Sequence, residues 1–148
     1  MTIVGVPDRP GVAYGILGPI ADANIEVDMI VQNASAEGLT DFTFTVHRND
    51  YDTAMKILDK TAADIGARSV VGDRKIAKVS VVGVGMRSHA GIASKMFKVL
   101  ANEGINIQMI STSEIKVSVV VDEKYLELGV RALHSAFGLD KDGTAKIE

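Results

Sequence analysis

The sequence predicts an α+β protein made of two βαββαβ halves, each with two helices packed on one face of an antiparallel sheet. One observation is that the chain repeats itself, and another is that each copy alternates between strand-like and helix-like spacing of its apolar residues. In addition, 148 residues that are 47% hydrophobic and 24% charged contain enough apolar material for packed cores. We therefore expect domains at residues 1–75 and 76–148, with strand exchange between them left open as an alternative.

The internal repeat is visible by direct comparison of the chain with itself. Residues 4–6 read VGV and open one segment, and residues 82–84 read VGV and open a second. From Gly11 and Gly91 onward the two segments match at a constant offset of 80, whereas the offset is 78 before these glycines and near 74 in later elements. A unit of about 75 residues is longer than a solenoid repeat and has the size of a small domain.

The elements of each half follow from local patterns. Runs rich in β-branched residues predict first strands at residues 2–6 and 76–84. Apolar residues at helical spacing predict helices at residues 11–23 and from Gly91 to Leu100. Second strands are expected at residues 25–32 and 105–111, and third strands at 42–47 and 116–121. Second helices are expected at 51–65 and 123–137, after the N-cap residues Asp50 and Asp122. Short fourth strands are expected at 67–72 and 144–148. This order is that of two ferredoxin-like domains.

Composition excludes several classes of protein. The chain has no cysteine, which removes disulfides and thiolate chemistry and fits a cytoplasmic location. Its longest stretch without a charged residue is residues 10–21, shorter than the roughly 18 apolar residues that a membrane span needs. The net charge is −3 with acids and bases mixed, so we expect neither a nucleic-acid surface nor a membrane surface.

Catalytic and metal-binding patterns are missing from the sequence. His47, His89 and His134 have no metal-ligand spacing, and we expect them at a strand end, in a loop and on a solvent-facing helix. The dinucleotide-like start Gly83-Val84-Gly85 lacks the required third glycine. The carboxylates near the turns have no identifiable proton-donor partner. We therefore expect no catalytic residue, no metal and no cofactor in this chain.

The junction between the first strand and the first helix of each half is the best candidate for a site. The chain enters these helices at Gly11-Val12-Ala13 and at Gly91-Ile92-Ala93. A helix start offers unpaired backbone amides and the positive end of the helix dipole, so it can hold a carboxylate, and glycine allows close approach. The alternative is that both glycines only permit the turn. Their recurrence in both halves favours a ligand.

Six segments of the two halves are distinctive, namely PDRPGVA, MRSHAGIA, IEVDMIVQN, INIQMISTSE, TDFTFTV and ISTSEIKVSVV. They resemble the tandem ACT domains of the regulatory part of aspartate kinase, and ISTSEIKVSVV is the most specific of them. The resemblance covers essentially the whole chain. It implies two ferredoxin-like ACT domains that control the first step from aspartate to lysine, threonine, methionine and isoleucine. It also implies that this chain is not an enzyme by itself, because the kinase domain that would use ATP and Mg²⁺ is absent from the sequence.

The resemblance further implies a homodimer that works with an aspartate kinase catalytic domain or subunit. The first half of one copy would lie beside the second half of the other. The first effector site would combine Asp8, Gly11, Val12, Ala13 and Gln32 with Asn106 and Ile107 of the partner. The second would combine Met86, Ser88, Gly91, Ile92, Ser113 and Glu114 with Glu26, Val27 and Asp28 of the partner.

Charge distinguishes the two expected effectors. Glu26, Asp28 and Glu114 crowd the second site, and carboxylates attract the second cation of free lysine, so lysine is expected there and neutral threonine in the first site. One alternative is that these carboxylates are solvated and only threonine binds. Others are a free-standing ACT-type sensor of a different amino acid, a dimerisation module without a ligand, or a small enzyme on the same scaffold.

Overall fold

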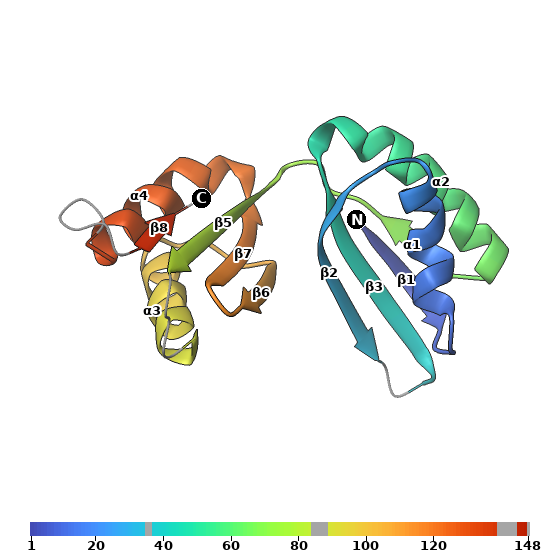
Figure 1. Ribbon diagram of the computed structural model, residues 1–148, viewed down its shortest axis with the longest axis horizontal. Coiled ribbons are helices and arrows are strands. Elements are labelled where there is room, and N and C mark those ends of the chain that lie inside the picture. The colour runs from blue at the N-terminus through green and yellow to red at the C-terminus, as the bar shows by residue number, and fades with distance from the viewer. Residues whose placement is uncertain (35–36, 84–88, 139–144, 148) are drawn as a thin grey trace. The chain divides into compact units, whose positions relative to one another are not determined.

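The computed structural model of the protein describes residues 1–34, 37–83, 89–138 and 145–147. Both halves run through the same elements in the same order (Figure 1). The first half contains β1 (Thr2–Pro7), α1 (Val12–Asp22), β2 (Val27–Ala34), β3 (Leu39–Val46), the 3-10 turn η1 (Arg48–Asp50), α2 (Tyr51–Ile65) and β4 (Ser69–Val71). The second half contains β5 (Ile76–Gly83), α3 (His89–Asn102), β6 (Met109–Ser113), β7 (Lys116–Asp122), the 3-10 turn η2 (Glu123–Tyr125), α4 (Leu126–Ala136) and β8 (Ala145–Ile147).

The two halves form separate compact units, Met1–Arg74 and Lys75–Glu148. Each unit has one four-stranded sheet, in the order β2-β3-β1-β4 and β6-β7-β5-β8, and the described strand pairs are all antiparallel. All four strands of each sheet come from one half, so the described strands are not exchanged between the halves. The α+β prediction of two βαββαβ halves is confirmed.

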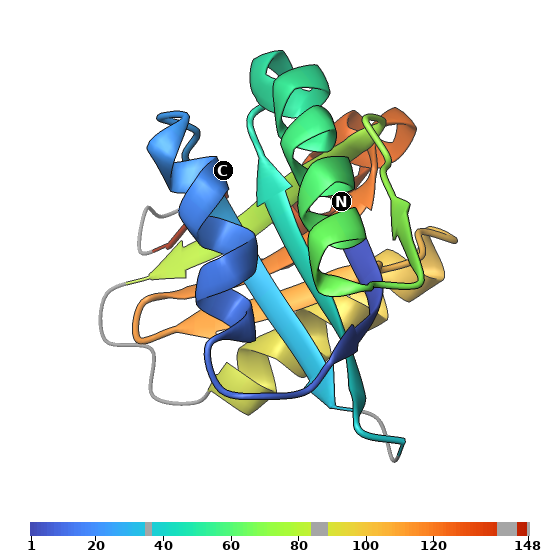
Figure 2. The same cartoon turned by 90° about the vertical axis from the view of Figure 1, so that its right-hand side faces the viewer.

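Each unit has its own apolar core between its sheet and its two helices. Figure 2 shows α1 and α2 side by side over one face of the first sheet. The first core joins strand residues to helix residues and includes Ile3, Val6, Phe42, Phe44, Ile16, Ile20 and Leu58. The second core is built in the same way from Val79, Val81, Val117, Val119, Met96, Leu100 and Leu133. Because the helices cover only one face, alternate strand residues form each core.

The second strand of each half begins later than predicted. The Ile25 amide donates to the Ile20 carbonyl at 3.2 Å, and the Ile105 amide donates to the Leu100 carbonyl at 2.9 Å. The residue before each isoleucine has a positive φ, so both helices end in the Schellman arrangement. Both isoleucines are therefore buried under a helix end, and β2 and β6 begin two and four residues after them.

Of the two predicted N-caps, Asp122 makes a side-chain cap and Asp50 does not. The Asp122 carboxylate accepts from the Lys124 amide at 3.0 Å and caps η2, not α4 directly. Asp50 makes no side-chain cap, and the ring nitrogen Nδ1 of His47 instead accepts from the Asn49 amide at 3.2 Å. A 3-10 turn precedes both helices. η2 begins at Glu123, the predicted start, so Asp122 stands at its cap, whereas η1 begins at Arg48, three residues before the predicted start of α2, so the first unpaired amides there follow His47.

Candidate functional site

The junction between β1 and α1 requires glycine at residue 11. Gly11 caps the helix with φ +89°, a left-handed conformation that other residues rarely adopt. A Cβ atom added there would meet nothing within 4 Å, so the space over the helix start is open. The Gly15 amide donates to the Gly11 carbonyl at 3.0 Å, which places the first helical turn directly after the glycine.

The start of α1 carries the positive end of the helix dipole. No side chain caps α1, and its first turn contains no acidic residue. The first turn of α3 also lacks an acidic residue, whereas α2 and α4 carry Asp52 and Glu127 there. The amides of Ala13 and Tyr14 lie in first-turn positions that have no acceptor inside a helix. A carboxylate placed over Gly11 would satisfy them and would also be stabilised by the helix dipole.

Two residues outside the predicted site, Gly38 and Asp41, hold the end of β1 and the loop that follows it. The Asp8 amide donates to the Gly38 carbonyl at 2.9 Å, and the Gly5 amide donates to the Asp41 carboxylate at 3.0 Å. Both acceptors come from the hairpin between β2 and β3. The repeat in the sequence gave no clear signal, because at an offset of 74 Lys116 aligns with Phe42. The strand registers align Lys116 with Asp41, and a lysine side chain cannot accept a hydrogen bond.

The other residues predicted for the first site divide between the two units. Val12 is buried, and Ala13 is half-buried against the same core, so the Ala13 side chain contributes to packing as well as to the junction. Gln32 is exposed on the edge strand β2, opposite Phe42. Asn106 is exposed and Ile107 half-buried in the segment before β6, in the other unit. Both were predicted to complete the first effector site from a second copy of the chain.

The second junction differs from the first in one respect. Gly91 is the third residue of α3, so the helix begins before the glycine instead of after it. His89, predicted in a loop, is the first residue of this helix. Ile92 is half-buried against the second core. Met86 and Ser88, also predicted for this site, lie outside the described residues. The sequence between the VGV segment and the glycine is two residues longer in this half than in the first, which leaves room for a helix that begins before the glycine.

The residues predicted to recognise the lysine side chain lie at strand ends. Ser113 is the exposed last residue of β6, and Glu114 is exposed in the turn that follows. Glu26 and Asp28 are exposed at the start of β2, while Val27 between them packs on the first core. This alternation places both carboxylates on the side of the strand away from Val27.

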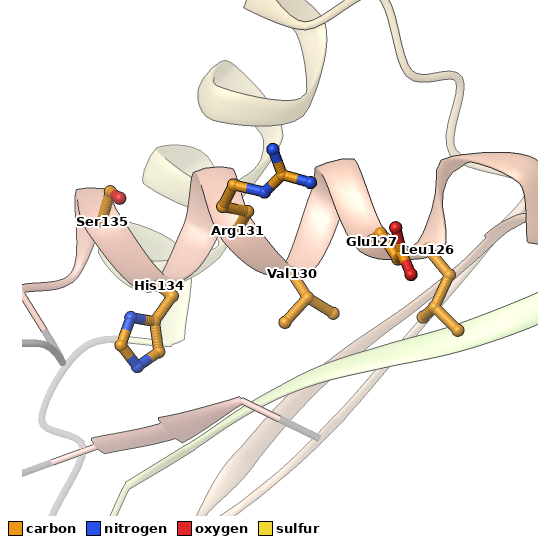
Figure 3. A pocket seen from close by; sticks show the side chains of 6 residues that line it. All are labelled: Leu126, Glu127, Val130, Arg131, His134 and Ser135. Atoms are coloured by element: carbon orange, nitrogen blue, oxygen red, sulfur yellow. The ribbon is translucent and has the colours of Figure 1, made fainter.

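Two surface hollows lie elsewhere, on the helices of the second half. The one in Figure 3 has a volume of about 470 Å³ and is lined by Leu126, Glu127, Val130, Arg131, His134 and Ser135 of α4. Leu126, Val130 and His134 extend from one side of the helix in this view. His134 is exposed there, as predicted. None of the residues predicted to bind an effector lines this hollow.

Two negative findings apply to the described residues. They contain no group of three or more His, Cys, Asp or Glu side chains placed to hold a metal ion. None of the described helices combines the length and the apolar composition that crossing a membrane requires.

Comparison with known proteins defines the class. Two ACT-domain family profiles match the chain, at residues 1–63 and 79–137. Each match falls within one βαββαβ unit. The protein is therefore a pair of ACT domains in tandem.

Relatives over the whole chain define the family. The aspartate kinase of Pseudomonas fluorescens is 76% identical over 140 residues, which is 95% of this chain and 34% of that protein. A crystal structure of aspartokinase alpha and beta subunits is 63% identical with a TM-score of 0.86, and the match covers 93% of this chain and 90% of that one. The ligand-free regulatory subunit of aspartate kinase from Thermus thermophilus is 38% identical with a TM-score of 0.84, covering 92% and 89%. The chain belongs to the aspartate kinase family, as its regulatory ACT domains, and spans about a third of the length of the curated relatives it matches.

Proposed function

We propose that this chain is the effector-binding module through which free threonine and lysine inhibit an aspartate kinase. The observation that carries the proposal is the start of α1, where an open glycine cap, no capping side chain and no first-turn acid coincide within the described residues. The absence of a first-turn acid recurs at α3, in a chain that belongs to a regulatory domain family. A free amino acid supplies the carboxylate that such a helix start favours.

In the first site, the amides at the start of α1 bind the carboxylate of threonine. Asp8, exposed in the same loop, receives the ligand ammonium. Gln32 and the partner's Asn106 are amide side chains that can donate to or accept from the threonine hydroxyl. The partner's Ile107 covers the ligand methyl group. Each of the four groups of threonine, its carboxylate, ammonium, hydroxyl and methyl, thus has a partner of suitable chemistry in this site.

In the second site, the start of α3 binds the carboxylate of lysine. Glu114 lies at the end of β6, and Glu26 and Asp28 of the partner bring two more carboxylates. All three are exposed, so each contributes modestly by itself, and the site depends on their convergence around one ammonium group. Threonine carries no second cation and gains nothing from this arrangement.

Both sites need two copies of the chain, so we propose a homodimer in the cytoplasm that is attached to a kinase catalytic domain or subunit. An effector inhibits only if it binds the inactive arrangement more tightly than the active one, with a coupling of typically about 1 to 3 kcal/mol. ATP and Mg²⁺ belong to the catalytic part, and the residues of this chain have no role in holding them.

Calorimetric titration of the chain and of its variants tests the proposal. We expect threonine and lysine each to bind, and Asp28→Ala to lose lysine affinity while threonine affinity is unchanged. Asp59→Ala, which removes an exposed carboxylate from α2, is the matched control and should bind both normally. Unchanged lysine affinity in Asp28→Ala would refute the assignment of lysine to the second site.

A second measurement separates the proposal from the other readings of the sequence. A ligand that binds only the native state raises the thermal midpoint of unfolding, so the chain can be heated with each of the twenty common amino acids. A shift with threonine and lysine alone is the expected result. A shift with a different amino acid indicates another kind of sensor, and no shift with any indicates a dimerisation module without a ligand.

A further inference from the structure

We propose that Asp41 is a positioning residue for the first effector site, acting through a bulge in β1 that sets where the Asp8–Gly11 loop leaves the sheet. This inference rests on the proposed function, because it concerns the site assigned to threonine. Asp41 itself lies on β3, outside the set of residues expected to touch the effector.

The bulge is defined by the register of β1 against β3. Ile3 lies opposite Phe42, but Val6 lies opposite Thr40, so β1 contains one residue more than β3 over this span. Gly5 adopts φ +67° within it, which is the geometry of a bulge with a left-handed glycine. Asp41 occupies the place on β3 that faces the extra residue.

The Asp41 carboxylate satisfies the amide that the bulge removes from the ladder. The Gly5 amide donates to Asp41 Oδ1 at 3.0 Å, across 36 residues of sequence. On the other side of β1, the Arg68 amide donates to the Val4 carbonyl at 2.8 Å, and a Cβ atom on Gly5 would come within 2.8 Å of the Arg68 Cβ. Gly5 is buried and Asp41 is exposed, so the hydrogen bond is part-buried, and loss of the carboxylate would leave the Gly5 amide to a partner that water replaces only in part.

In the described part of the second half, the same strand pair is built without a carboxylate at this place. Gly83, the counterpart of Gly5, donates its amide to the Ile115 carbonyl at 2.8 Å. The register of β5 against β7 is continuous from Ile76 to Val82. Lys116 stands at the place of Asp41 and lies opposite Val82. Over the described part of this strand, which ends at Gly83, a continuous register and a lysine therefore take the place of the bulge and the carboxylate of the first half.

The bulge determines how the loop reaches the helix start. Beyond it, Pro7 pairs with Leu39, and the Asp8 amide donates to the Gly38 carbonyl at 2.9 Å. Removal of the extra residue from the strand would shift this register by one place. Such a shift reverses the faces of the residues that follow, including Val6 in the core. Asp41 thus keeps Asp8 and Gly11 in the places that the proposed threonine site requires.

Three variants of the chain test the proposal. Asp41→Ala removes the acceptor, and Asp41→Asn keeps an acceptor oxygen without the charge. Ser118→Ala, which loses a hydrogen bond in the other half, controls for a general loss of stability. Amide hydrogen exchange of Gly5 and Asp8 is measured by NMR without any effector, and threonine and lysine affinities are measured by calorimetry.

We expect Asp41→Ala to speed amide exchange at Gly5 and Asp8 by about tenfold. We expect the same variant to weaken threonine affinity by about tenfold and to leave lysine affinity unchanged. Asp41→Asn should restore most of both effects, and Ser118→Ala should show neither. If the unsubstituted chain binds threonine and Asp41→Ala binds it equally well, the positioning role is overturned while the proposed function survives. If the unsubstituted chain binds no threonine, the proposed function fails. The role of Asp41 in holding the bulge is then judged by exchange alone, and unchanged exchange at Gly5 in Asp41→Ala would overturn it.

Discussion

The hydroxyl oxygens of Ser80 and Ser118 lie 2.7 Å apart across β5 and β7, where the two residues are direct partners in the register. Thr2 and Thr43 form the equivalent pair across β1 and β3, with their oxygens 2.9 Å apart. Ser80 follows Thr2 by 78 residues, the offset of the repeat before the glycines, and Ser118 follows Thr43 by 75 residues, within one residue of the offset near 74 of the later elements. The repeat therefore extends to an individual side-chain hydrogen bond.

Removal of one partner of the serine pair should cost more than removal of both. Ser80 and Ser118 are buried, so Ser118→Ala leaves a hydroxyl without its partner and is expected to lower the free energy of unfolding by about 1 to 3 kcal/mol. In Ser80→Ala/Ser118→Ala no unpaired hydroxyl remains, and the loss should be smaller than the sum of the single losses. Urea unfolding of the four proteins measures this coupling.

The threonine pair provides the matched control for that experiment. Thr2 and Thr43 are only half-buried, so water can replace either partner, and the same cycle should give a smaller coupling. Equal coupling in the two cycles would show that burial is not what makes the serine pair matter.

Gly129 on α4 can be replaced by alanine with a gain in stability. A Cβ atom there would lie 3.6 Å from Leu100 Cδ2 and 3.7 Å from Ile105 Cδ1, which is ordinary van der Waals contact. Because glycine is a poor helix former, Gly129→Ala should raise the free energy of unfolding by about 0.5 to 1 kcal/mol. Gly104→Ala is the control, since φ is +70° there, and it should destabilise by about 1 kcal/mol. A loss of stability in Gly129→Ala, measured by thermal unfolding, would contradict this packing.

Two leucines on the same helix should differ strongly in their contribution to stability. Leu133 is fully buried in the second core, and Leu133→Ala is expected to cost about 2 to 5 kcal/mol through lost burial and the cavity it leaves. Leu126 is 38% exposed, and Leu126→Ala should cost less than about 1.5 kcal/mol. Denaturant unfolding of both variants checks the difference, and similar costs would show that α4 packs differently.

Ser113 offers a cleaner steric test of the lysine site than Ala13 offers of the threonine site. Ser113 is exposed at the end of β6, so Ser113→Phe should block lysine binding and leave the thermal midpoint nearly unchanged. Ala13 packs against the first core, so a bulky residue there would disturb folding and binding together. Calorimetry on Ser113→Phe should find threonine affinity intact, and normal lysine binding in this variant would place the lysine site elsewhere.

Local periodicity was sufficient to predict most elements. The helix expected at residues 51–65 is found as Tyr51–Ile65, because its apolar spacing and its boundaries are both encoded within the segment. The second strands were placed too early, because Ile25 and Ile105 continue an apolar run that reads as strand. Their burial under a helix end depends on the carbonyls of Ile20 and Leu100, which only the completed helix brings to the right place.

For the candidate site, the chain by itself determined which residues share each junction. Asp8, Gly11, Val12 and Ala13 come together because they are contiguous, and the repeat in the sequence draws attention to them. The tertiary structure decided what holds that junction, namely Asp41 through the Gly5 amide and Gly38 through the Asp8 amide. These partners lie some thirty or more residues apart. The register of strand pairing sets such contacts, and a one-residue bulge changes that register without altering the apolar pattern along the chain.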